Sequence, residues 1–79
     1  MTSQPIARVL DCRGLTCPTP VVKLSVAIKT IDKGAVLELL ADDPGSVPDV
    51  EAFQQQTGHV VIEQTEAGGV FSFVIRRTT

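Results

Sequence analysis

The alternation of apolar and polar residues predicts four β-strands along this chain. Residues 5–11 (PIARVLD) form a short β-rich run that opens with a proline, and residues 35–41 (AVLELLA) place every second residue on one apolar face. Two further runs follow at 59–66 (HVVIEQTE) and 70–77 (VFSFVIRR), joined by the short glycine-rich connection 67–69. We therefore expect the last two strands to form a hairpin.

A first helix is predicted by apolar residues that recur at spacings of three and four with polar residues between them. It begins near residue 20, and its buried stripe consists of Val21, Leu24, Ile28 and Ile31. Lys33 and Gly34 follow as a basic last turn and the glycine that ends a helix. This helix would connect the first and second strands.

A second helix is predicted between the second and third strands. Ser46, with Asp49 three residues later, resembles the start of a capping box, and Pro48 is tolerated in a first helical turn. Gly58 would end the helix. Its buried stripe consists of Val47, Val50 and Phe53.

The predicted order is β-α-β-α-β-β. Each helix has one apolar stripe and must cover a sheet, so the expected fold is α/β (α+β), a two-layer sandwich over residues 1–79 as a single domain. Right-handed crossovers would place both helices on one face of a four-stranded mixed sheet. The other face would carry Val36, Glu38 and Leu40, a mixed surface open to solvent or to a partner.

Composition and charge exclude several classes of protein. The formal net charge of −2 gives no reason for direct binding to nucleic acid or to an anionic membrane. No apolar run reaches the roughly 18–20 residues that span a bilayer, so we expect no membrane insertion. The first ten residues (MTSQPIARVL) lack the pattern of a secretory signal, which predicts a cytoplasmic protein with reduced thiols.

Cys17 is the candidate nucleophile, because prolines at 18 and 20 fit the first turn of the first helix. If Cys17 is the N-cap, Pro18 and Pro20 are the first and third helical residues, and the sulfur lies at the positive end of the helix dipole. This placement predicts a lowered thiol pKa. Arg13 and Lys23 would add positive charge nearby. The structural alternative is a small buried cysteine.

The sequence predicts no metal site and no cofactor. Cys12 and Cys17 lack companion ligands, since His59 is the only histidine. Asp42 and Asp43 precede a proline and indicate a turn. Cys12 has two interpretations: a resolving thiol that forms a disulfide with Cys17, or a strand-end cysteine that packs inward.

Four segments of the chain resemble the TusA-type (SirA-like) sulfur-carrier family: LDCRGLTCPTP (10–20), LELLADDPGSVPDV (37–50), GHVV (58–61) and FVIRR (73–77). The resemblance covers almost the whole chain and implies the same β-α-β-α-β-β fold. It implies that Cys17, in the C-P-x-P motif, carries a persulfide. The other motif positions of the family correspond to Asp11, Gly14, Pro18 and Pro20.

The resemblance implies a sulfur carrier or sulfurtransferase that relays sulfane sulfur rather than a stand-alone enzyme. Its donor would be a protein of the cysteine desulfurase or rhodanese type, or thiosulfate, and its acceptor another protein. Examples of the receiving pathway are tRNA thiolation, cofactor sulfuration and sulfur oxidation. Two other classes remain open: a thiol–disulfide redox protein that uses Cys12 and Cys17, and a non-catalytic interaction or regulatory module.

Overall fold

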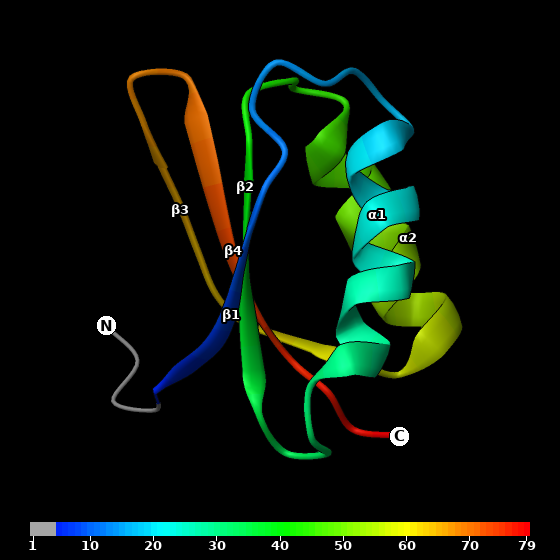
Figure 1. Ribbon diagram of the computed structural model, residues 1–79. Helices are drawn as coiled ribbons and strands as arrows, with labels where there is room; N and C mark the ends of the chain where they lie inside the picture. Colours follow the sequence, from blue (N-terminus) through cyan, green and yellow to red (C-terminus); the bar gives the residue numbers. More distant parts are fainter. Residues whose placement is uncertain (1–4) are drawn as a thin grey trace.

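The computed structural model describes residues 5–79, and its elements follow the predicted order β-α-β-α-β-β (Figure 1). The predicted domain (1–79) and the predicted absence of a secretory signal also involve residues 1–4, which lie outside the described range. The elements are β1 (Ile6–Asp11), α1 (Thr19–Ala27) with a 3₁₀ turn (Ile28–Thr30), β2 (Val36–Ala41), α2 (Ser46–Thr57), β3 (Val60–Ala67) and β4 (Val70–Arg76).

The sheet is mixed, as predicted, with the strand order β1-β2-β4-β3. β1 pairs with β2 in parallel, whereas β4 is antiparallel to both β2 and β3. β2 and β3 therefore run in the same direction, and each helix connects two strands of one direction. Figure 1 shows both helices on the same side of the sheet, so the predicted two-layer sandwich is confirmed.

The core lies between the sheet and the two helices. The predicted alternation in β2 and β4 is confirmed, because every second residue of each strand faces the helices and is buried, or partly buried in the case of Phe71. Full burial of one large aliphatic side chain contributes roughly 1.5–3 kcal/mol. The largest apolar side chains of this core with at most 2% exposure are Leu24, Ile28, Leu37, Leu39, Val50, Phe73 and Ile75.

On the opposite face of the sheet, neighbouring side chains partly shield one another from solvent. Val36 was predicted on this face, yet it is 0% exposed because it lies between Ile6 and Arg76 in the strand register. Glu38 accepts a hydrogen bond of 2.6 Å from the hydroxyl of Ser72 on β4. The expectation that Val36 is part of an open surface is therefore wrong.

The first helix ends earlier than the prediction. α1 stops at Ala27, and after the 3₁₀ turn Ile31 is extended, with φ −105° and ψ 159°. Two contacts end the helix: the hydroxyl of Thr30 donates to the Ala27 carbonyl (2.6 Å), and Arg77 Nη1 donates to the Ile31 carbonyl (2.6 Å). Gly34, at φ +84°, lies in the turn before β2 and does not end α1.

The start of the second helix also differs from the prediction. The cap residue is Gly45 and makes no side-chain cap, while Ser46 is the first helical residue. Among the described residues, the buried Ser46 Oγ has no hydrogen-bond partner. The predicted capping box is therefore wrong, because Ser46 lies one position too far into the helix. Gly58, at φ +81°, ends α2 as predicted.

Candidate functional site

Two loops meet at one edge of the sheet and build the candidate site. Because β1 and β2 are parallel, their carboxyl ends share an edge, and Asp11 pairs with Leu40 in the register. Residues 12–18, which follow β1, therefore lie beside residues 42–45, which follow β2. Figure 1 shows these two segments next to each other at the top of the molecule.

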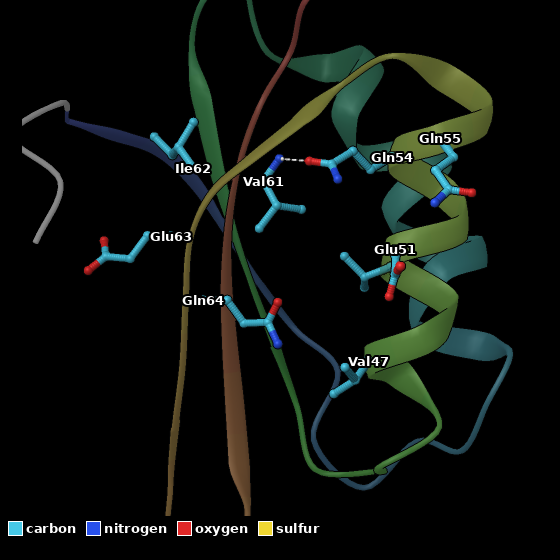
Figure 2. A pocket seen from close by; sticks show the side chains of 9 residues that line it. Val47, Glu51, Gln54, Gln55, Val61, Ile62, Glu63 and Gln64 are labelled. Atoms are coloured by element: carbon cyan, nitrogen blue, oxygen red, sulfur yellow. Dashed lines mark hydrogen bonds between the residues drawn. The ribbon is translucent and has the colours of Figure 1, made fainter.

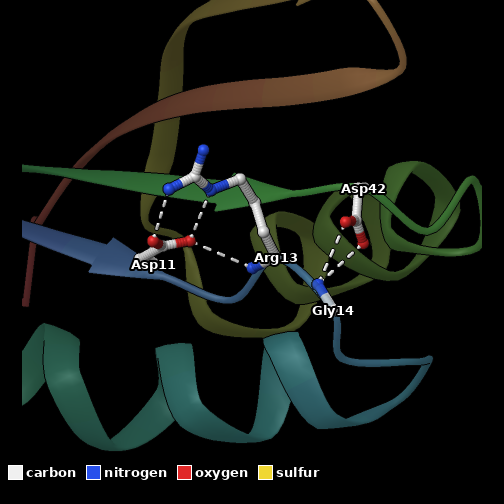
Figure 3. Close-up of polar contacts among 4 residues, drawn as sticks. All are labelled: Asp11, Arg13, Gly14 and Asp42. Carbon is white, nitrogen blue, oxygen red and sulfur yellow. Dashed lines mark hydrogen bonds and ion pairs between the residues drawn. The ribbon is translucent and has the colours of Figure 1, made fainter.

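The loop after β1 is fixed by two carboxylates (Figure 3). Asp11 accepts hydrogen bonds from the backbone N–H of Arg13 (3.1 Å) and from its guanidinium (2.8 and 2.9 Å). These bonds lower the pKa of Asp11 to about 2. Gly14 adopts φ +84°, and its N–H donates to both carboxylate oxygens of Asp42 at 3.0 Å. The motif residues Asp11 and Gly14 thus shape the loop that carries Cys17.

Cys17 lies on the surface, one residue outside the position predicted for it. α1 begins at Thr19 with Pro18 as its cap residue, and the Cys17–Pro18 peptide bond is cis. Pro20 is the second helical residue and is buried. The N–H of Thr19 donates to the Thr16 carbonyl at 2.9 Å. The prediction that Cys17 is the N-cap is therefore wrong, and this amide is not available to the sulfur.

Two carboxylates surround Cys17. Its backbone N–H donates to Asp43 Oδ2 at 2.6 Å, and its Sγ donates to Asp49 Oδ2. The hydrogen bond to Asp49 raises the pKa of Cys17 above its ordinary value, and desolvation and the negative charges of Asp49 and Asp43 raise it further. The predicted lowering of this pKa is wrong, because tertiary contacts bring anions to the thiol.

The cations predicted near Cys17 have other partners. Arg13 forms an ion pair with Asp11 at 2.8 Å. The charge of Lys23 acts on Cys12. Burial raises the pKa of Cys12, and the positive charge of Lys23 offsets part of this rise. The charges that act on the pKa of Cys17 are those of Asp49 and Asp43.

Gly45 packs directly against Cys17. A Cβ atom at Gly45 would lie 3.0 Å from the Cβ of Cys17 and 3.5 Å from its Sγ. Gly45 has φ −62°, so its backbone would accept any residue, and the close approach is the reason that glycine fits here.

Asp43, Gly45 and Asp49 belong to the site, and the sequence analysis did not assign them to it. The parallel pairing of the first two strands was the available signal, because it brings the residues after both strands to one edge.

A groove of about 300 Å³ between the two helices begins beside the thiol. Pro18 and Asp49, the neighbours of Cys17, line one part of it, and Val22 and Phe53 line another. Val22 is 56% exposed, and Val26 on the same helix is 66% exposed. The thiol therefore adjoins an exposed apolar strip on α1.

Cys12 is part of the core. Its side chain is 0% exposed, its N–H donates to the Leu40 carbonyl at 2.8 Å, and both cysteines are free thiols. This burial confirms the interpretation of an inward-packed cysteine. A disulfide would require at least one of the two side chains to move, because Cys12 is buried and Cys17 is exposed.

His59 has a structural position at the end of α2. Its ring is buried and stacks on Phe53, with the ring centroids 5.7 Å apart, and its Nδ1 accepts a hydrogen bond from the N–H of Thr78 at 3.1 Å. Desolvation, with the charge of Arg77, lowers the pKa of His59. The ring therefore ties the end of the chain to α2 as a neutral imidazole.

A second cleft, of about 470 Å³, lies between α2 and β3 (Figure 2). Its walls include Glu51 and Gln64, and Gln54 Oε1 accepts a hydrogen bond from the N–H of Val61 at 2.7 Å. Neither cysteine lines this cleft. Within residues 5–79, no group of three or more His, Cys, Asp or Glu side chains could hold a metal ion. No helix of this range is long and apolar enough to cross a membrane.

The sequence and the fold are matched by known proteins. Residues 8–77 match the family described as Sulfurtransferase TusA. The chain belongs to the TusA family. The resemblance seen in the sequence is thereby confirmed.

Two relatives illustrate the match within the TusA family. The chain is 42% identical over 69 residues to the sulfur carrier protein TusA of Allochromatium vinosum, which covers 87% of this chain and 91% of that protein. It is 33% identical over 75 residues to the sulfur carrier protein TusA of Pseudomonas paraeruginosa, with 95% of each chain covered.

A solved structure supports the fold. The crystal structure of a SirA-like protein from Desulfitobacterium hafniense superposes with a TM-score of 0.78 at 23% identity. The superposition covers 91% of this chain and 99% of that one.

Proposed function

We propose that this protein is a sulfur carrier that accepts sulfane sulfur as a persulfide on Cys17 and passes it to an acceptor protein. The observation that carries the proposal is an exposed cysteine at the loop edge of the sheet, in a chain of the TusA family. The relatives named above are themselves sulfur carrier proteins, which supports the same role here.

The chemistry requires only a thiol and access to it. The thiolate of Cys17 attacks the outer sulfur of a donor persulfide R–S–SH, so that a new S–S bond forms and R–S⁻ leaves. With thiosulfate the leaving group is sulfite. An acceptor thiolate then attacks the outer sulfur of Cys17–S–SH and regenerates Cys17. Such exchange depends on the thiolate fraction, the leaving group and access.

The partners follow from this chemistry. The donor is a protein of the cysteine desulfurase or rhodanese type, or thiosulfate, and the acceptor is a protein with a reactive thiol or an activated substrate. The apolar strip with Val22 and Val26 beside the thiol supports docking of such proteins. The exchange belongs in the cytoplasm, where thiols remain reduced.

Intact-protein mass spectrometry without reductant tests the proposal, after incubation with a cysteine desulfurase and cysteine or, separately, with thiosulfate. We expect a gain of about 32 Da that peptide mapping assigns to Cys17. A loss of about 2 Da that links Cys12 to Cys17 would instead indicate a redox protein. An unchanged mass with both donors would contradict sulfur loading on Cys17.

A further inference from the structure

Asp49 is the nearest charged neighbour of the candidate nucleophile, although it lies 32 residues further along the chain. It belongs to the first turn of α2, and its Oδ2 accepts a hydrogen bond from Cys17 Sγ. The proton between the two groups resides on the sulfur, because a thiol holds its proton far more tightly than a carboxylic acid does. The contact with Asp49 therefore favours a neutral thiol over a thiolate.

We infer that Asp49 holds the resting Cys17 as a protonated thiol and takes up the thiol proton when sulfur is loaded. Asp49 would be a catalytic residue of the loading step, because it contacts the reacting sulfur of Cys17 and accepts its proton. The second part of this inference rests on the proposed function, whereas the first part concerns the thiol alone.

The groups around Cys17 support this role from each element that packs against it. From α2, Asp49 contacts the sulfur, and from the turn after β2, Asp43 accepts the Cys17 N–H at 2.6 Å. In the loop before Cys17, Arg13 is paired with Asp11, and from α1 the charge of Lys23 acts on Cys12. A thiolate at this position would therefore lie between two carboxylates, which disfavours it.

The loading step balances with Asp49 as the proton acceptor. The proton moves from Cys17 Sγ to Asp49 Oδ2, and the thiolate attacks the outer sulfur of the donor R–S–SH. The donor S–S bond breaks, and R–S⁻ leaves and takes the proton from Asp49. The net reaction converts Cys17–SH and R–S–SH into Cys17–S–SH and R–SH, with no external oxidant or reductant.

The consequence is a thiol that reacts slowly when the carrier is free. Alkylation of Cys17 at neutral pH would be slow, because only the thiolate is the nucleophile and the thiolate fraction would be small. Asp49 would thus protect the carrier between loading events while keeping the proton acceptor next to the sulfur.

The test compares Asp49→Asn with Glu51→Gln in the full chain. Glu51 is an exposed acid of the same helix that lines the opposite cleft, so its variant removes the same charge elsewhere. The rate of Cys17 alkylation by iodoacetamide is measured against pH, with Cys17→Ala as the background. Asp49→Glu, which keeps the charge, serves as the conservative variant.

We expect the midpoint of the alkylation profile to move to lower pH in Asp49→Asn only. Removing an adjacent like charge raises the thiolate fraction about tenfold. Because nucleophilicity falls with thiol pKa, the rate at pH 7 should then rise about threefold. Asp49→Glu should keep a midpoint closer to that of the original protein. Coinciding midpoints for the original protein, Asp49→Asn and Glu51→Gln would overturn the inference.

A measurement on the unsubstituted protein covers the case in which Asp49→Asn does not fold. The carboxyl carbon resonance of Asp49, followed by NMR, should show an inflection at the pH where Cys17 ionises. Absence of that inflection would refute the contact in solution. Sulfur loading of the original protein is measured separately by mass. If the midpoint shifts in Asp49→Asn but the original protein takes up no sulfur, the sulfur-carrier function is refuted. If the original protein takes up sulfur but the midpoint does not shift in Asp49→Asn, the role of Asp49 is refuted.

Discussion

The Cα of Gly45 lies so close to Cys17 that a Cβ added there would be 3.0 Å from the Cβ of the cysteine. Real Cβ atoms are almost never closer than this distance. The turn after β2 therefore determines where the thiol lies, although Cys17 belongs to the loop before α1. The contact gives a direct way to move the thiol without changing it.

Larger residues at position 45 should displace the thiol in a graded manner. We expect sulfur loading to slow in Gly45→Ala and to slow about tenfold in Gly45→Val, because small displacements of a reacting group are costly. Loading rates by mass spectrometry measure this effect. Pro44→Ala, at the exposed neighbouring position, is the control. Equal loading rates in all four proteins would show that Gly45 does not position Cys17.

Substitution of Cys12 should lower the stability of the protein, whereas substitution of Cys17 should abolish sulfur transfer. Cys12→Ser places a hydroxyl in the core, which should cost about 1–3 kcal/mol in the free energy of unfolding. It should leave most of the sulfur loading. Cys17→Ser should abolish loading and leave urea unfolding unchanged, because the side chain is exposed. Equal losses of loading in both variants would argue against a carrier with a single thiol.

Acid should loosen the loop that carries Cys17. The pKa of Asp11 is lowered to about 2 by hydrogen bonds from Arg13, and the pKa of Asp43 is lowered by the N–H groups of Cys17 and Gly45. A carboxylate whose pKa is lowered by folding contributes its full stabilisation above the pKa of the unfolded state, near 4. This contribution is lost as the pH falls through the pKa of the folded state.

This pH dependence is measurable as a melting temperature. The melting temperature of the original protein should fall more between pH 5 and pH 2 than that of Asp11→Asn or Asp43→Asn. Each variant lacks one of the carboxylates that become protonated in this range. Glu66→Gln, at an exposed position of β3, is the matched control. If either aspartate variant kept the full loss, its carboxylate would not contribute to acid sensitivity.

Ser46→Ala should stabilise the protein. Ser46 Oγ is buried without a hydrogen-bond partner in the described part of the chain, and such a group costs about 1 kcal/mol or more. Alanine removes the hydroxyl and suits the first turn of a helix. Chemical denaturation should show a gain of about 1 kcal/mol. A destabilised variant would mean that the hydroxyl has a bound partner in solution.

The sequence by itself determined the elements of this protein and their arrangement in layers. Alternation in β2 and β4 placed Leu37, Leu39 and Phe73 on the buried face, and helical spacing placed Leu24 and Val50 opposite them. These patterns are local, because each residue's face depends only on its position in its own element. The boundaries were less predictable, since Arg77, from the far end of the chain, binds the carbonyls of Lys29 and Ile31 just beyond the end of α1.

Only the tertiary structure decided the chemical surroundings of Cys17. The sequence placed the thiol next to prolines at a helix start, which suggested a lowered pKa. Parallel pairing of β1 with β2 instead brings Asp43, 26 residues away, and Asp49, 32 residues away, to the cysteine. The pKa of a thiol depends on charges within a few ångströms. Those distances are set by the strand register and the β2–α2 turn, which no local pattern contains.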